Sequence, residues 1–141
     1  MIVGWSLATN LRATLATEAL EMAVWRRGVE LDGLVHHSDA GSQYASVIYS
    51  ERLAELGIAP SVGSVGDSYD NAAMESAIGL YKTELIRRRG PWRSPDQVEF
   101  DTLEYIDWFN NRRLHGQIGY VPPTEFEEMI RASQIEEQIK G

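Results

Sequence analysis

Cysteine is absent from the 141 residues of this chain. Its absence excludes disulfide bridges and thiolate metal sites, and it makes the reducing cytoplasm the expected location. Long apolar runs are missing as well, and no uninterrupted segment approaches the roughly 20 residues of a membrane-spanning helix. The first residues lack the basic stretch and apolar core of a signal peptide. We therefore expect a cytoplasmic protein with no membrane partner and one domain large enough for a real core.

Basic residues are also few compared with acidic residues. The formal net charge is −8, whereas a nucleic-acid-binding protein normally shows a positive surface. The charges are unevenly distributed, because residues 82–93 hold five basic residues and one acidic residue, while residues 125–141 hold five Glu against Arg131 and Lys140. A local basic patch can hold nucleic acid within an acidic chain. The overall balance still argues against tight unaided DNA binding.

Hydropathy patterns predict alternating strands and helices. Short apolar, partly β-branched runs predict strands at 2–7, 31–37 and 58–62, and helical spacing of apolar residues predicts helices at 11–27, 43–55, 71–89 and 94–115. Gly-rich and Ser-rich residues 63–69 predict a mobile loop, and Pro122 with Pro123 predicts the start of a last short helix. Positions expected to face the core include Met22, Leu53, Ile78, Leu85, Val98, Leu103, Ile106 and Phe109.

Two acidic residues stand where these elements could bring them together. Asp39 follows an apolar strand-like run, and Glu75 lies just inside the helix that begins after Asp70, with 35 residues between the two acids. A carboxylate at a strand end that faces a carboxylate on a helix can hold a divalent metal over a phosphate. Each acid has an ordinary alternative role. Asp39 could cap the next helix, which spacing alone favours, and Glu75 could complement its helix dipole.

The motifs around these acids resemble a known family. Residues 37–44 read His-Ser-Asp-Ala-Gly-Ser-Gln-Tyr, residues 69–76 read Tyr-Asp-Asn-Ala-Ala-Met-Glu-Ser, and residues 80–84 read Leu-Tyr-Lys-Thr-Glu. They are similar to the catalytic domains of bacterial insertion-sequence transposases, which resemble retroviral integrases and belong to the DDE group. The resemblance covers residues 1–128 and implies an α/β, incomplete ribonuclease-H-like fold with a short mixed sheet flanked by helices. Residues 129–141 would then form a polar C-terminal tail.

The resemblance implies that Asp39 and Glu75 are catalytic residues and metal ligands. The family uses three carboxylates to hold two Mg²⁺ or Mn²⁺ ions, which serve phosphodiester hydrolysis and DNA strand transfer. Its first carboxylate lies upstream of the segment similar to residues 2–5, so this sequence holds only two of the three. We therefore expect weak metal binding and no activity for the chain alone. Gln43 and Asn71 flank the two acids and are expected to support them by hydrogen bonding.

Basic residues downstream of Glu75 are candidates for DNA binding. Lys82 follows Glu75 by seven residues, nearly two helical turns, so both would project from one face. The resembled family places a lysine there, where it would meet a DNA phosphate near the metals, and the alternative is a solvated lysine. Arg87 and Arg88 could extend this phosphate contact, or they could complement the C-terminus of the helix.

Arg112 and His115 match a recurrent Arg-x-x-His of the same family. They could contact DNA, pack the last helix, or do both. Packing is the favoured alternative.

The resemblance also predicts a missing part of the sheet. The family's five strands have the order 3-2-1-4-5, and segments 2–7 and 33–38 are similar to strands 3 and 4. Strands 1 and 2 have no counterpart here, so an unpaired edge and an apolar face would remain, and we expect a homodimer or larger oligomer. The sequence is thus interpreted as the C-terminal part of a transposase catalytic domain. Alternatives are a truncated transposase that binds and restrains intact subunits, or a nuclease that borrows its third carboxylate from another subunit.

Overall fold

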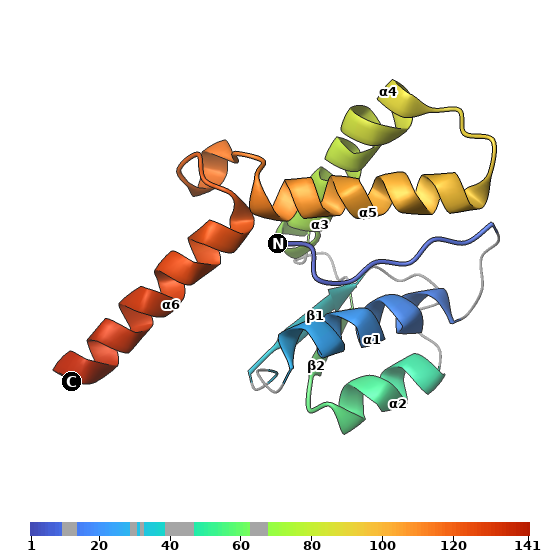
Figure 1. The fold of residues 1–141 in the computed structure, drawn as a ribbon. Helices are drawn as coiled ribbons and strands as arrows, with labels where there is room; N and C mark the ends of the chain where they lie inside the picture. The colour runs from blue at the N-terminus through green and yellow to red at the C-terminus, as the bar shows by residue number, and fades with distance from the viewer. Residues whose placement is uncertain (10–13, 29–30, 32, 39–46, 63–67) are drawn as a thin grey trace. The chain divides into compact units, whose positions relative to one another are not determined.

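The structure, a computed structural model, describes residues 1–9, 14–28, 31, 33–38, 47–62 and 68–141 (Figure 1). The chain divides into two compact units. The strand unit is Val3–Pro95, and the helical unit is Asp96–Gly141 together with Met1–Ile2. The α/β character predicted for an incomplete ribonuclease-H-like fold is confirmed, because helices accompany a small sheet. In the described part of the chain, no helix is long and apolar enough to cross a membrane.

The sheet of the strand unit consists, within the described residues, of two parallel strands. β1 (Val35–Ser38) pairs in register with β2 (Ala59–Val62) along its whole length. The connection between them contains α2 (Val47–Glu55), as the crossover between parallel strands requires. Strands were expected over 31–37 and 58–62, so both predictions are confirmed apart from their first residues. Because β1 runs on to Ser38, it ends at the residue before Asp39.

The core of the strand unit lies where α1 (Leu15–Arg27) meets α2. Its buried side chains are Leu20, Tyr49, Leu53 and Ile58, with Ala16, Val24 and Leu56 packed against them. Leu53 is buried as predicted, but Met22 is 41% exposed, so its prediction as a core residue is wrong. Ala16, Leu20 and Val24 recur every four residues and therefore share the face that meets α2. Met22 lies on another face of the same helix.

The N-terminal segment does not form a strand, so the strand predicted at residues 2–7 is wrong. From Val3 onward the segment runs along α1 instead (Figure 1). The backbone of Gly4 lies so close to that helix that a Cβ there would come within 2.1 Å of the Ala19 carbonyl oxygen. The hydroxyl of Ser6 donates a hydrogen bond to Glu18 at 2.8 Å. A strand needs a neighbouring strand to pair with, and this segment has a helix beside it.

A long helical stretch follows β2. It consists of α3 (Ser68–Tyr81), a π-helical turn η1 (Lys82–Ile86) and α4 (Arg87–Arg89). The helix predicted over 71–89 is confirmed, and it begins three residues early, inside the predicted loop. Leu85 is buried as predicted, whereas Ile78 is largely exposed. α3 packs against β1, and this contact positions the candidate site.

The helical unit is built on α5 (Pro95–Asn111) and α6 (Pro123–Lys140), with a 3-10 turn η2 (Gly116–Ile118) between them. The buried side chains of α5 are Thr102, Tyr105, Ile106, Phe109 and Asn110. Ile106 and Phe109 confirm the prediction. Leu103 does not, since it is 54% exposed and points about 100° away from its neighbour Thr102. α6 was predicted to be short, but it continues through the expected tail.

Candidate catalytic and nucleic-acid site

The strand that leads to Asp39 and the helix that carries Glu75 are in contact. β1 ends at Ser38, whose side chain is buried, and α3 packs against this strand. Asp39 and Gln43 themselves lie outside the described residues, as does the side chain of Asn71 in α3. The structure therefore shows that the strand leading to Asp39 contacts the helix that carries Glu75.

Glu75 lies on the exposed surface of α3, seven residues after the helix begins. A carboxylate in this place is accessible to a cation or to a substrate. No group of three His, Cys, Asp or Glu that could hold a metal occurs among the described residues. Carboxylate oxygens are nevertheless the hard ligands that Mg²⁺ and Mn²⁺ favour.

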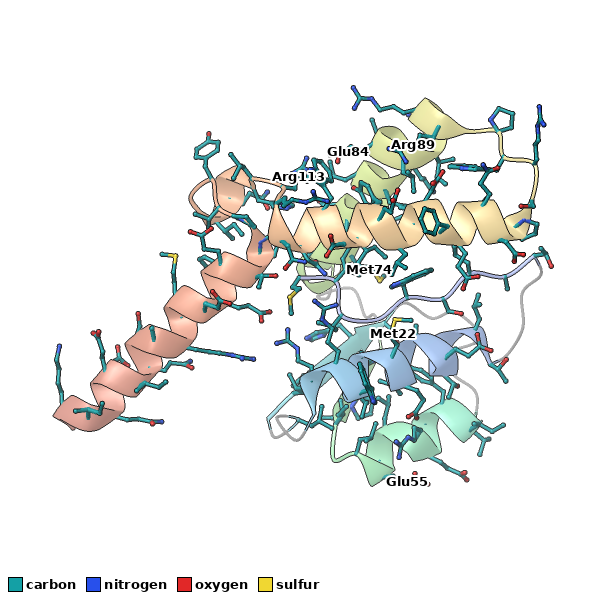
Figure 2. The ribbon with its side chains drawn as sticks, viewed as in Figure 1. Met22, Glu55, Met74, Glu84, Arg89 and Arg113 are labelled. Atoms are coloured by element: carbon teal, nitrogen blue, oxygen red, sulfur yellow. The ribbon has the colours of Figure 1, made fainter. Side chains whose placement is uncertain are left out.

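The three basic candidates Lys82, Arg87 and Arg88 are all exposed. Lys82 begins the π-helical turn, and the backbone N–H of Arg87 donates its hydrogen bond to the carbonyl of Lys82. Between Glu75 and Tyr81 the chain is α-helical, so Lys82 stays on the Glu75 side of the helix. In Figure 2, Met74, Glu84 and Arg89 mark the course of this helical stretch from α3 to α4.

Arg112 and His115 belong to the helical unit and have different surroundings. Arg112 is exposed, and its Nη2 lies 3.6 Å from the carboxylate of Asp107. His115 is half-buried, with its ring edge-on to Phe109 at a centroid distance of 4.5 Å. Its Nε2 lies 3.3 Å from the Phe109 carbonyl, and its Nδ1 lies 3.2 Å from Nη1 of Arg113. A neutral ring protonated on Nε2 satisfies both contacts, which supports the packing role for His115.

Arg113 completes the same cluster. Its guanidinium lies 5.9 Å from the ring centre of Trp108 and 6.0 Å from that of Phe109, as expected for cation–π contacts. The cluster closes the loop after α5, where His115 and Val121 form an antiparallel bridge. Of the two residues that define the Arg-x-x-His motif, His115 is therefore packed and Arg112 is exposed.

Asn110 is a residue whose role the sequence did not reveal. Its side chain is fully buried, yet both polar ends are satisfied by the backbone of Ile2. Nδ2 donates to the Ile2 carbonyl at 2.7 Å, and Oδ1 accepts from the Ile2 N–H at 2.8 Å. The amide therefore pairs with Ile2 as a neighbouring strand would. The available signal was its spacing, because Thr102, Ile106 and Asn110 recur every four residues on the buried face of α5.

Two polar contacts join elements around the core of the strand unit. Tyr49 is buried, and its hydroxyl lies 2.6 Å from Nε2 of half-buried His36 on β1. Burial lowers the pKa of His36 below its usual range. On the other side, Arg52 of α2 binds Glu21 of α1 through both carboxylate oxygens. The hydrogen bonds from Arg52 hold the pKa of Glu21 below its ordinary value.

Comparisons with known proteins agree with these motifs. Residues 1–68 and 56–123 match two family models that are both described as integrase core domain. A putative transposase for insertion sequence element IS986/IS6110 from Mycobacterium tuberculosis strain H37Rv is 52% identical over 137 residues, which are 94% of this chain and 49% of the relative. The transposase for IS629 from Shigella sonnei is 48% identical over 132 residues, which are 94% of this chain and 44% of the relative.

A more distant relative extends the same pattern. The transposase InsF for insertion sequence IS3A from Escherichia coli K12 is 35% identical over 127 residues, covering 89% of this chain and 43% of the relative. The chain spans about half the length of the curated relatives it matches. Its two integrase-core matches together reach from residue 1 to residue 123. The chain therefore belongs to the integrase core family, of the kind found in insertion-sequence transposases.

Proposed function

We propose that this chain supplies two carboxylates, Asp39 and Glu75, to a centre that cuts and joins DNA with the help of divalent metal ions. The observation that carries this proposal is the packing of α3 against β1. It links the helix of Glu75 to the strand that ends one residue before Asp39. A cap role for Asp39 would need no such partner on α3. The names of the relatives, transposases of insertion sequences, support the same reaction class.

Asp39 and Glu75 would hold Mg²⁺ or Mn²⁺ through their oxygens, and Gln43 and Asn71 would orient them. When bound, the metal polarises a phosphodiester and lowers the pKa of an attacking water or 3′-hydroxyl. Glu75 is suited to this work because its carboxylate is exposed on a helix that is fixed to the sheet. Two carboxylates by themselves bind such ions weakly, so we propose weak metal binding by this pair.

DNA is the proposed substrate, in the form of transposon ends and target. Lys82 is exposed beyond Glu75, in a segment where basic residues outnumber acidic ones, and we propose that at least one of the two exposed arginines that follow it, Arg87 and Arg88, binds DNA with it. Such residues bind phosphates and release counterions, so affinity should fall steeply with salt. Arg112 is exposed on a separate unit and remains a candidate for DNA contact. For His115 we propose the packing role.

Metal titration tests the carboxylate pair. Isothermal calorimetry with Mn²⁺ should show binding to the chain, and Asp39→Asn and Glu75→Gln should each weaken it by about tenfold or more. Glu51→Gln is a matched control, because Glu51 is exposed on α2 and the variant removes one charge elsewhere. If the titrations of the chain and Asp39→Asn coincide, the pair does not bind metal and the proposal fails.

We also propose that the chain forms a homodimer or larger oligomer. Leu34 and Val35, at the start of β1, are 43% and 51% exposed. Apolar side chains on an open sheet favour a covering partner. Light scattering should therefore show more than one chain per particle at micromolar concentration. A well-behaved monomer there contradicts this proposal and leaves the metal site untouched.

A second candidate function is non-catalytic. The net charge of −8 favours a module that binds intact transposase subunits and restrains them. Co-purification with an intact transposase, together with inhibition of that enzyme, would favour this function over the first.

We also propose residues 1–128 as the core and 129–141 as an appended tail, although α6 runs across that boundary.

A further inference from the structure

The helical stretch that carries Glu75 is interrupted by one wide turn. In η1 the N–H of Arg87 reaches back five residues to the carbonyl of Lys82, instead of the four residues of an α-helix. The turn holds one residue more than an α-helical turn would. Each residue after it therefore takes the direction that its predecessor would have in an uninterrupted helix.

This shift determines which arginine lies on the same side of the helix as Glu75 and Lys82. Lys82 lies about 20° from Glu75 around the helix axis, since each α-helical residue turns by about 100°. In an uninterrupted helix, Arg87 would lie about 120° from Glu75 and Arg89 only about 40° from it. With one residue absorbed by the wide turn, Arg87 moves to about 20° from Glu75, while Arg88 and Arg89 lie about 120° and 140° away.

Burial distinguishes the two sides of the helix in this segment. Leu85 of η1 is 3% exposed, so the side of the turn that carries Leu85 is buried. Glu75, Lys82 and Arg87 are all exposed. Arg89 already takes part in an interaction of its own. The exposed side of the helix thus carries a carboxylate, then an ammonium group, then a guanidinium group.

We propose that Arg87, and not Arg88 or Arg89, continues with Lys82 a phosphate-binding row on the Glu75 face. The inference rests on the proposed function and specifies its DNA contact. Lys82 and Arg87 lie about one helical turn apart, so two long side chains can reach neighbouring phosphates of one strand. The guanidinium can bind a phosphate through two hydrogen bonds, while the ammonium acts as a point charge.

Binding of a fluorescent duplex DNA tests the row without any need for catalysis. The full chain and its Lys82→Ala, Arg87→Ala, Arg88→Ala and Arg89→Ala variants would be titrated by fluorescence anisotropy over a series of salt concentrations. The three arginine variants are matched, because each removes one positive charge from adjacent positions. Arg87→Ala and Lys82→Ala should weaken binding by about tenfold and lower the salt slope by about 0.9.

Arg88→Ala and Arg89→Ala should leave both quantities close to those of the chain. Arg87→Lys should keep the salt slope, and circular dichroism of every variant checks that the helices remain. Equal losses for all three arginine variants, or a loss confined to Arg89→Ala, overturn the choice of Arg87 while the DNA-binding function stands. A chain without salt-dependent binding overturns the DNA contact of the proposed function as well.

Discussion

His36 is a half-buried titratable side chain on β1, the strand that leads to the candidate site. Its ring packs edge-on to Tyr49 at 5.3 Å and shares a hydrogen bond with the tyrosine hydroxyl. Burial favours the neutral ring and therefore lowers its pKa, and the positive charge of His37 acts in the same direction. A histidine with a lowered pKa stabilises the fold above its unfolded pKa of about 6.5, and that stability is lost as the pH falls toward the folded pKa.

We predict that the chain loses stability as the pH falls below the unfolded pKa of about 6.5, and that His36→Gln removes much of this loss. Thermal unfolding followed at several pH values on both sides of this pKa measures the loss. His37→Gln, at the exposed neighbour on the same strand, should remove a smaller part of the loss, because it removes the charge of His37 but leaves His36 buried. If His36→Gln and the unchanged chain show the same pH dependence, protonation of His36 does not limit stability.

Asn110 holds the N-terminus through its side chain, so its replacement leaves two backbone groups unpaired. We predict that Asn110→Ala lowers the free energy of unfolding by about 2–3 kcal/mol. Asn111→Ala, at the exposed end of the same helix, breaks a 2.9 Å bond to Asp107 and a 2.8 Å bond from Thr124. Water can replace these contacts, so the loss should be smaller. Urea unfolding compares the two, and equal losses would contradict the role of Asn110.

At the scale of elements, the packing of the N-terminal segment on α1 depends on a missing side chain. A Cβ at Gly4 would also come within 2.9 Å of the backbone nitrogen of Ala23. We predict that Gly4→Ala destabilises the chain by about 1–3 kcal/mol, because segment and helix must move apart. Gly79→Ala should act oppositely and stabilise by about 0.5–1 kcal/mol, since it lies inside α3 with open space around it. Chemical denaturation of both variants tests this difference in sign.

The positions of most helices and strands were predictable from the sequence, but which side of each helix is buried was less predictable. Apolar spacing identified Leu85, Ile106 and Phe109 as buried, because each belongs to a regular stripe. In α1 the same spacing predicted that Met22 is buried and did not identify Leu20. Apolar residues surround much of this helix, so its buried face is determined only by its contact with α2. The strand predicted at 2–7 failed because strand propensity has no effect without a partner.

The candidate site also has features that the sequence predicted and features that it did not. Its acids and Lys82 came from motifs, and the helix that carries Glu75 and Lys82 is confirmed. The π-helical turn was not predicted, since local sequence does not report the packing of Leu85 that accompanies it. Asn110 was missed as a buried residue because asparagine is usually exposed. A polar residue on an otherwise apolar stripe is the signal that would have identified it.

At the scale of the whole molecule, metal binding should be visible as stability. A cation that binds only the folded chain stabilises it by about 2.7 kcal/mol at a hundredfold excess over Kd. We predict that Mn²⁺ raises Tm, that a chelator reverses the rise, and that Asp39→Asn abolishes it. Glu51→Gln should retain the full rise. An equal rise in Asp39→Asn would mean that Mn²⁺ binds elsewhere on this acidic chain.

The first residues of the chain belong to both units. Met1–Ile2 pair with the helical unit through Asn110, and Gly4 is seated on α1 of the strand unit. An affinity tag or dye attached at the amino end would therefore sit next to a buried hydrogen-bonded pair. The last turns of α6 are exposed up to Gly141. Labels, tethers and fusion partners for biophysical work belong at that carboxyl end.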